Sequence, residues 1–178
     1  MTYTDASLLT NSIMSSYVEL VVGIFAIRQN GIGNLFCSIG ELSVESSFKH
    51  QHFIIGLQDF ISKITTDEYK MLHMQTAFRQ LNRMFILSMW EILVGHNRYN
   101  DICNEEEIQF FRHIRNGCAH DNKLNFKQLE KTAKWRTVEL KSSDIARSIF
   151  PDVLKDGDPI LLLIDINNKY FTPINFYK

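Results

Sequence analysis

Apolar residues recur every three or four positions through most of the first 120 residues, which is the pattern of amphipathic helices. The pattern predicts one helix over about residues 6–28 and a second over residues 53–64, with Ser43 as an earlier alternative start. Both stretches carry polar residues between the apolar ones. Each therefore predicts a helix with one buried face.

The longest predicted helix covers residues 68–96. Its segment 84–94 is apolar nearly all round, which is typical of a helix in the middle of a bundle. The strongly polar members of this segment, Ser88 and Glu91, lie three positions apart and so share a face.

The fourth predicted helix has the clearest start. Asn104 can cap it, and Glu107 stands three residues later, which is the spacing of a capping box. Gly117 is a natural point for this helix to bend or end. A shorter helix is expected over residues 126–133. The inward stripe of the fourth helix consists of Ile108, Phe111, Ile114 and Cys118.

The last third of the chain has a different pattern. Residues 137–140 predict a short strand, and the apolar run 159–166 and the alternating run 170–177 predict a hairpin around Asn167-Asn168. The expected fold is mainly α, a four- to five-helix bundle over residues 1–133. A small β appendage over residues 134–178 packs on the same domain.

Composition is ordinary for a soluble globular protein: 178 residues, 45% hydrophobic, 22% charged, with a net charge of -1. Three scattered cysteines without a CxxC pair argue against a disulfide scaffold and fit a reducing cytosol. Neither a signal peptide nor a membrane span is indicated. The expectation is a soluble, cytoplasmic protein.

The candidate chemistry lies in "RHIRNGCAHDN", residues 112–122. Residues 112–141 contain eight basic and three acidic residues, a local charge of +5, which indicates either a solvated helix face or a surface for phosphates. Arg115 can grip a phosphate through two parallel N–H bonds. His120 can exchange protons near neutral pH, and Asn116 can orient either partner. The histidines show no HExxH-type metal spacing, and no cofactor is expected.

The segment "RNGCAH", with an arginine, a polar residue, three further residues and a histidine near the end of a late helix, resembles the signature of HEPN domains (higher eukaryotes and prokaryotes nucleotide-binding). The segments "KWRTVEL" and "GDPILLLIDI" resemble a C-terminal extension of some HEPN-like proteins from plasmids and defence loci. The resemblance implies a helical bundle and a metal-independent endoribonuclease, acting as a toxin or in defence against phage or plasmids. Attack by a ribose 2′-OH would leave a 2′,3′-cyclic phosphate.

The same resemblance implies Arg115, Asn116 and His120 as catalytic residues. Glu91, Ser88 and Gly117 are supporting candidates. Arg112, Lys123 and Lys127 are candidates for contacts with the RNA backbone. Two motifs of a homodimer would meet at one interface, and an antitoxin of unknown identity is a further expected partner. Some HEPN toxins carry a tyrosine two residues after the histidine, a site of modification, whereas this chain has Asn122 there.

Two alternatives stay open. Arg115 and His120 can be the polar end of a helix that satisfies backbone carbonyls, or they can belong to a non-catalytic RNA-binding or partner-recruiting module. In a straight helix, positions five apart diverge by roughly 140°. A bend at Gly117 or a second subunit would have to bring the two side chains to one phosphate.

Overall fold

A computed structural model describes residues 16–20, 22–23, 41–45, 52–56, 67–126 and 129–171. The chain divides into two compact units. One comprises Met1–Tyr17 and Arg79–Lys178, and the other comprises Val18–Phe78. The described residues are mainly helical, with short antiparallel strand pairs.

In the smaller unit, β1 (Glu41–Glu45) and β2 (His52–Gly56) form an antiparallel pair. The helix predicted over residues 53–64 is therefore wrong over its described part, 53–56. The run "HFIIG" is short, apolar and ended by a glycine, and periodicity alone does not separate a strand from a buried helix in such a run. Of the first predicted helix, residues 16–20 and 22–23 are described and helical, and the rest lies outside the described residues.

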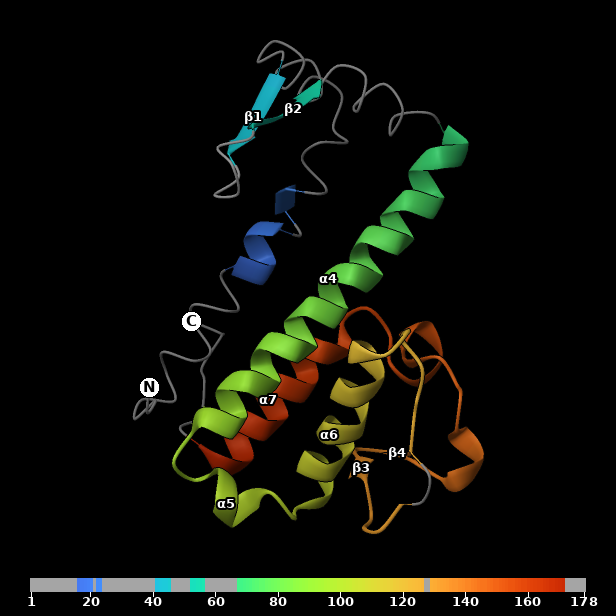
Figure 1. Cartoon of the computed structure of the whole chain (residues 1–178). Helices are drawn as coiled ribbons and strands as arrows, with labels where there is room; N and C mark the ends of the chain where they lie inside the picture. Colours follow the sequence, from blue (N-terminus) through green and yellow to red (C-terminus); the bar gives the residue numbers. More distant parts are fainter. Residues whose placement is uncertain are drawn as a thin grey trace. The chain divides into compact units, whose positions relative to one another are not determined.

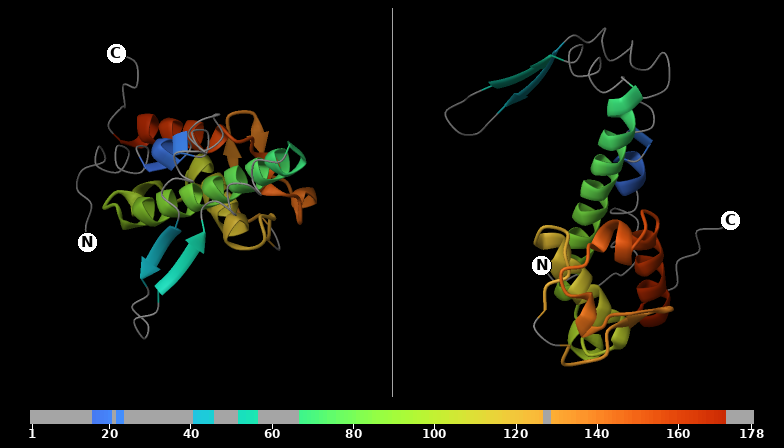
Figure 2. Two further views of the ribbon diagram at one scale, coloured as in Figure 1. Left: turned by 90° about the horizontal axis from the view of Figure 1, so that it is seen from above. Right: turned by 90° about the vertical axis from the view of Figure 1, so that its right-hand side faces the viewer.

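The core of the larger unit lies between three helices (Figures 1 and 2). These are α4 (Asp67–Gly95), of which the part from Arg79 belongs to this unit, α6 (Glu106–Ala119) and α7 (Asp158–Tyr170). The short helix α5 (Tyr99–Ile102) lies between α4 and α6 in the chain. The fully buried side chains of the three main helices include Ile86, Met89, Ile108, Phe110, Phe111, Ile114 and Leu162.

The longest predicted helix is confirmed as α4, but one stripe of it is open to solvent. Met84, Ser88, Glu91 and Val94 follow one another at helical spacing and are all exposed. The apolar segment 84–94 thus has a buried face and an exposed one, rather than a place at the centre of a bundle.

The hairpin predicted over residues 159–177 is wrong where it is described, because residues 158–170 form α7. Asn167-Asn168 lies inside this helix and is no turn. Pro159 stands in the first helical turn, where its missing N–H costs nothing, and Asp158 suits the positive end of the helix. Packing against the core outweighs the strand preference of "PILLLIDI". The buried residues recur at helical spacing: Leu162, Leu163, Ile166 and Tyr170.

The short strand predicted over residues 137–140 is confirmed in part. β3 (Lys134–Trp135) pairs with β4 (Val138–Glu139) in a two-residue hairpin. The hairpin is fastened to α7 by Asp165, which accepts hydrogen bonds from the Trp135 Nε1 at 2.9 Å and the Arg136 Nε at 2.6 Å. The helix predicted over residues 126–133 is wrong for its described members, which lie outside any helix.

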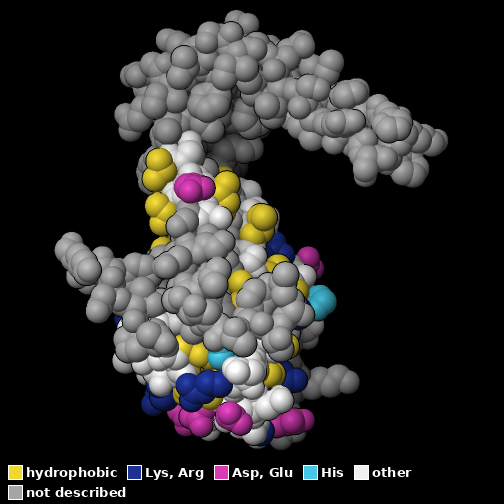
Figure 3. Space-filling model, turned by 90° about the vertical axis from the view of Figure 1, so that its left-hand side faces the viewer, with side chains coloured by type: hydrophobic (Ala, Val, Ile, Leu, Met, Phe, Trp, Pro, Cys, Tyr) yellow, Lys and Arg dark blue, Asp and Glu magenta, His cyan; other side chains and the backbone are white. Residues whose placement is uncertain are grey.

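Opposite charges join the ends of α6 and α7. The Lys169 Nζ lies 2.7 Å from the Glu107 Oε1, and the Tyr170 hydroxyl donates to the Glu107 Oε2 at 2.8 Å. Burial and the contact with Glu107 together raise the pKa of Tyr170 to about 12. On the face drawn in Figure 3, acidic and basic side chains lie next to one another at the lower end of the molecule.

The segment that follows α6, residues 122–124, is hydrogen-bonded to residues 146–150 later in the chain. The Asn122 amide imitates a peptide group: its Nδ2 donates to the Phe150 carbonyl at 2.8 Å, and its Oδ1 accepts from the Phe150 N–H at 3.3 Å. The Ile149 N–H donates to the Asn122 carbonyl at 2.8 Å. Asp121 and Asn122 have φ angles of 53° and 60°, a conformation that asparagine and aspartate tolerate better than most residues.

We predict that Asn122→Ala lowers the free energy of unfolding by about 2 kcal/mol, because it removes two hydrogen bonds and puts an alanine at a positive φ. Urea denaturation measures the change. The control is Asn97→Ala, an exposed asparagine outside this contact, which should cost less than about 0.5 kcal/mol. Equal losses in the two variants would mean that the Asn122 contact contributes nothing.

Candidate functional site

The candidate motif lies on the C-terminal half of α6 and just beyond it. The N-terminus of the helix differs from prediction. Glu105, not Asn104, is the N-cap, and no side chain caps the helix. The predicted capping box fails because its members have partners elsewhere in the fold: the Asn104 side chain accepts a hydrogen bond from Lys131, and Glu107 binds Lys169 and Tyr170.

The helix neither bends nor ends at Gly117, contrary to the prediction. The glycine is buried inside α6, and the helix continues to Ala119. A β-carbon at this position would lie 2.7 Å from both the Lys123 carbonyl oxygen and the Ile149 Cδ1. The glycine is needed because the returning chain packs directly against the helix, which is a structural role.

The C-terminal end of α6 is bound by an arginine of α4. The Arg83 Nε and Nη2 both donate to the Cys118 carbonyl, at 2.9 and 2.7 Å. This satisfies one of the carbonyls that a helix end leaves open, and it puts a cation at the negative end of the helix dipole. His120 follows as the C-cap residue, with its backbone N–H on the Asn116 and Gly117 carbonyls at 3.2 and 3.1 Å.

Arg115 is the best-connected member of the predicted trio. Its Nη1 lies 3.3 Å from the Asn116 Oδ1, and its Nη2 lies 3.2 Å from the Glu91 Oε1 on α4. The Arg115 side chain is 31% exposed and that of Glu91 is 69% exposed, so the ion pair is largely open to water and weak. The buried Arg115 Nε has no hydrogen-bond partner in the described part of the chain.

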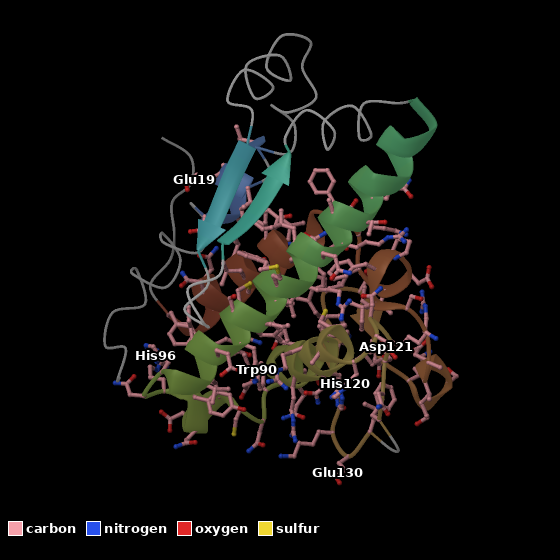
Figure 4. The ribbon with its side chains drawn as sticks, turned by 45° about the horizontal axis from the view of Figure 1, so that its top comes forward. Glu19, Trp90, His96, His120, Asp121 and Glu130 are labelled. Atoms are coloured by element: carbon pink, nitrogen blue, oxygen red, sulfur yellow. The ribbon has the colours of Figure 1, made fainter. Side chains whose placement is uncertain are left out.

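The structure brings Arg115, Asn116 and Glu91 together but does not join them to the other candidates. Within the described residues, no hydrogen bond or ion pair links the His120 side chain to Arg115. Figure 4 shows His120 beside Asp121 at the end of α6, away from His96. Ser88 and Lys123 are exposed, with no bond from their side chains to the trio, and Lys127 lies outside the described residues.

Beside the trio, α6 forms one wall of a polar cleft with a volume of about 330 Å³. Arg112, His113 and Asn116 line it from α6. Across from them, α5 and the flanking loops contribute Tyr99, Asn104 and Lys131. Asn116 thus belongs both to the trio and to the cleft.

His113 lies beside the motif, where the sequence favours a surface or packing role for it, and the structure places it in the cleft wall. Burial, and then the charge of Arg112, hold the pKa of His113 below its usual value, so the imidazole is neutral at pH 7. Its ring meets Phe126 edge-on at 5.1 Å, and its buried Nδ1 has no partner in the described structure. Spacing could have revealed it, because positions 112, 113 and 116 share one helix face.

Comparison of the chain with protein-family models, with curated proteins and with solved structures finds no match. The described residues contain no group of three or more His, Cys, Asp or Glu side chains arranged to hold a metal ion. Among these same residues, no helix has the length and apolar character needed to cross a membrane.

We predict that Gly117→Ala lowers the free energy of unfolding by about 2 kcal/mol, because the added methyl group forces the Lys123 backbone away from the helix. The matched control is Gly157→Ala, where a β-carbon meets nothing within 4 Å and the change should stay below about 1 kcal/mol. Thermal or urea unfolding of both variants measures the difference. A Gly117→Ala protein as stable as its control would show that the helix and the returning chain separate without cost.

We predict that His113→Gln flattens the dependence of stability on pH. The folded protein holds the pKa of His113 below that of the unfolded chain, so the unfolded chain binds more protons just below pH 6.5. The contribution of neutral His113 to the free energy of unfolding is fully present above about pH 6.5. It is lost as the pH falls toward the lowered pKa. Urea midpoints at about pH 7.5 and 5.5 should therefore differ less in the variant than in the wild type. An unchanged difference would contradict the lowered pKa.

Proposed function

We propose that this protein is a metal-independent endoribonuclease of the HEPN-like class, with Arg115, Asn116 and His120 as its catalytic residues. The observation that carries the proposal is the weak, solvent-exposed binding of the Arg115 guanidinium. Its guanidinium lies beside Asn116, and among the described residues its one ion-pair partner is the exposed carboxylate of Glu91. An RNA phosphate can replace or join such a weak partner.

In the proposed reaction, Arg115 binds the non-bridging oxygens of the scissile phosphate as negative charge grows on them. His120 accepts the proton of the ribose 2′-OH while the 2′ oxygen attacks the phosphorus. The bond to the 5′ oxygen breaks, and this oxygen takes up a proton. The products are a 2′,3′-cyclic phosphate and a 5′-hydroxyl. Asn116 and Glu91 position the guanidinium.

A site shared by two subunits is favoured by the lack of a direct link between Arg115 and His120. His120 follows the last residue of α6, and no hydrogen bond or ion pair joins its side chain to Arg115 in the described part of the chain. In a homodimer, Arg115 of one subunit would face His120 of the other across a two-fold axis. The proposed role is that of a cytoplasmic toxin or defence effector against phage or plasmids, restrained by an antitoxin whose identity is open.

We predict RNA cleavage in the presence of EDTA, with cyclic-phosphate ends. His120→Ala and Arg115→Ala should each lower the rate by at least about a hundredfold, the usual loss for a general base or a charge-stabilising group. Lys134→Ala removes an exposed cation from β3 and is the control, with a rate within about twofold of wild type. Gel analysis of the products gives both the rates and the end groups.

Mixing the two inactive variants tests the shared site. If Arg115 and His120 of one site come from different subunits, each mixed dimer regains one intact site, and the mixture should show about a quarter of the wild-type activity. If both residues come from one subunit, the mixture stays inactive. A folded wild type that cuts no RNA would overturn the ribonuclease proposal and favour a non-catalytic RNA-binding or partner-recruiting module.

A further inference from the structure

The polar cleft on α6 has no part in the chemistry proposed for the trio, apart from Asn116. The cleft is lined by two cations, Arg112 and Lys131, and by one carboxylate, Glu130, so its charged lining is net positive by one. Arg112 is exposed and has no ion-pair partner among the described residues. Lys131 donates one hydrogen bond to Asn104, and an ammonium group has two further N–H donors. Two cations at one cleft suit a phosphate group.

The other lining residues suit a flat heterocycle. Tyr99 and Phe126 bring aromatic rings to the cleft, and stacking on such rings is the usual way in which proteins hold an unpaired base. Asn104 and Asn125 add side-chain amides, which can both donate to and accept from the edge of a base. A site for a phosphate alone would have no use for the aromatic rings and the amides.

His113 adds an acceptor to this wall. Its buried Nδ1 has no hydrogen-bond partner in the described structure, so a ligand N–H that reaches it replaces no existing bond. A neutral imidazole can accept a hydrogen bond from a base N–H or a ribose hydroxyl.

The size of the cleft limits what it can hold. A volume of about 330 Å³ lies at the lower end of the range for small-molecule sites, roughly 300–1,000 Å³. That volume suits one nucleotide and is small for a dinucleotide cofactor. The cleft also adjoins the trio, because Asn116 lines it while its Oδ1 lies 3.3 Å from the Arg115 Nη1.

We propose that this cleft binds a single nucleotide, with the phosphate on Arg112 and Lys131 and the base against Tyr99 and the amides. The further step, that this nucleotide belongs to the RNA strand and neighbours the scissile phosphate, rests on the proposed function. In that case the cleft selects the base beside the cut, and Arg112 and Tyr99 determine specificity.

The test uses the full chain carrying His120→Ala, so that no cleavage is needed. Fluorescence anisotropy measures the binding of short oligonucleotides of rA, rC, rG and rU. One base should be preferred by at least about fivefold. Adding Arg112→Gln should weaken the binding of the preferred oligonucleotide by about tenfold, because one charge-assisted hydrogen bond is lost. Adding Lys134→Gln instead removes an exposed charge outside the cleft and should change binding less than about twofold.

Two aromatic variants separate stacking from loss of the fold. Tyr99→Phe keeps the ring and should retain the base preference, whereas Tyr99→Leu should abolish it while the melting temperature shows that the protein is still folded. Nucleoside 5′-monophosphates then distinguish the two sources of the ligand. Competition by the preferred monophosphate, lost in Arg112→Gln, indicates a site that also accepts free nucleotides. Binding of the oligonucleotide without such competition indicates a site that needs the RNA strand.

Two outcomes would overturn the cleft proposal: equal effects of Arg112→Gln and Lys134→Gln, or equal binding of all four homopolymers. These results are independent of cleavage. If the wild type cuts RNA and neither Arg112 nor Tyr99 affects binding, the ribonuclease proposal stands and the cleft proposal is wrong. If the wild type cuts no RNA but binds one base through Arg112, the cleft proposal stands and the ribonuclease proposal is wrong.

Discussion

The hydrogen bonds from Arg83 to the Cys118 carbonyl fix the end of α6, and the candidate site depends on that end. The arginine satisfies a carbonyl that the helix leaves open and keeps a positive charge at the negative end of its dipole. Gly117 lets the returning chain lie directly on the helix, and Asn122 then binds Phe150 through both atoms of its amide. His120 lies between these contacts along the chain, and its backbone N–H is itself bonded to the Asn116 and Gly117 carbonyls.

An arginine also binds a backbone carbonyl at the C-terminal end of α7. Arg98 donates to the Tyr170 carbonyl, while its guanidinium lies 6.0 Å from the centre of the Phe171 ring. An arginine suits both helix ends because it offers several donors and keeps its charge at any relevant pH. The thiol of Cys118, by contrast, is inert: burial raises its pKa to about 12.

How far the sequence predicts the fold depends on how strongly a segment signals its period. The helices α4 and α6 were predictable because each has a long apolar stripe at helical spacing. The run that forms α7 predicts a strand instead, since seven of its eight residues are apolar and three of these are β-branched, which favours a strand until tertiary packing is known. Its start signals, Pro159 and Asp158, were available in the sequence. The capping box at Asn104 was a valid local pattern, but partners distant in the sequence replaced it.

The candidate site was predictable to a similar extent. Residue types and spacing single out Arg115, Asn116 and His120, and the polar pair on α4 indicated that Glu91 shares a face with Ser88. The resemblance names Glu91 as a supporting residue, but residue spacing does not show its contact with Arg115, because that contact depends on how α4 lies against α6. Residue spacing could not show the cleft either, since Tyr99 of α5 and Lys131 of the loop after α6 meet α6 only in the folded chain.

The Arg115 guanidinium lies between Glu91 and Asn116, and its ion pair with Glu91 is weak enough to be exchanged for another anion. A fully buried ion pair would cost several kcal/mol to break, whereas an exposed pair of this kind contributes about 0–1 kcal/mol. Under the proposed function, a phosphate at Arg115 would therefore compete only with a weak partner. If the cleft holds the neighbouring nucleotide, Asn116 is the one residue that touches both binding regions. Base recognition and phosphate binding would then be coupled through a single side chain.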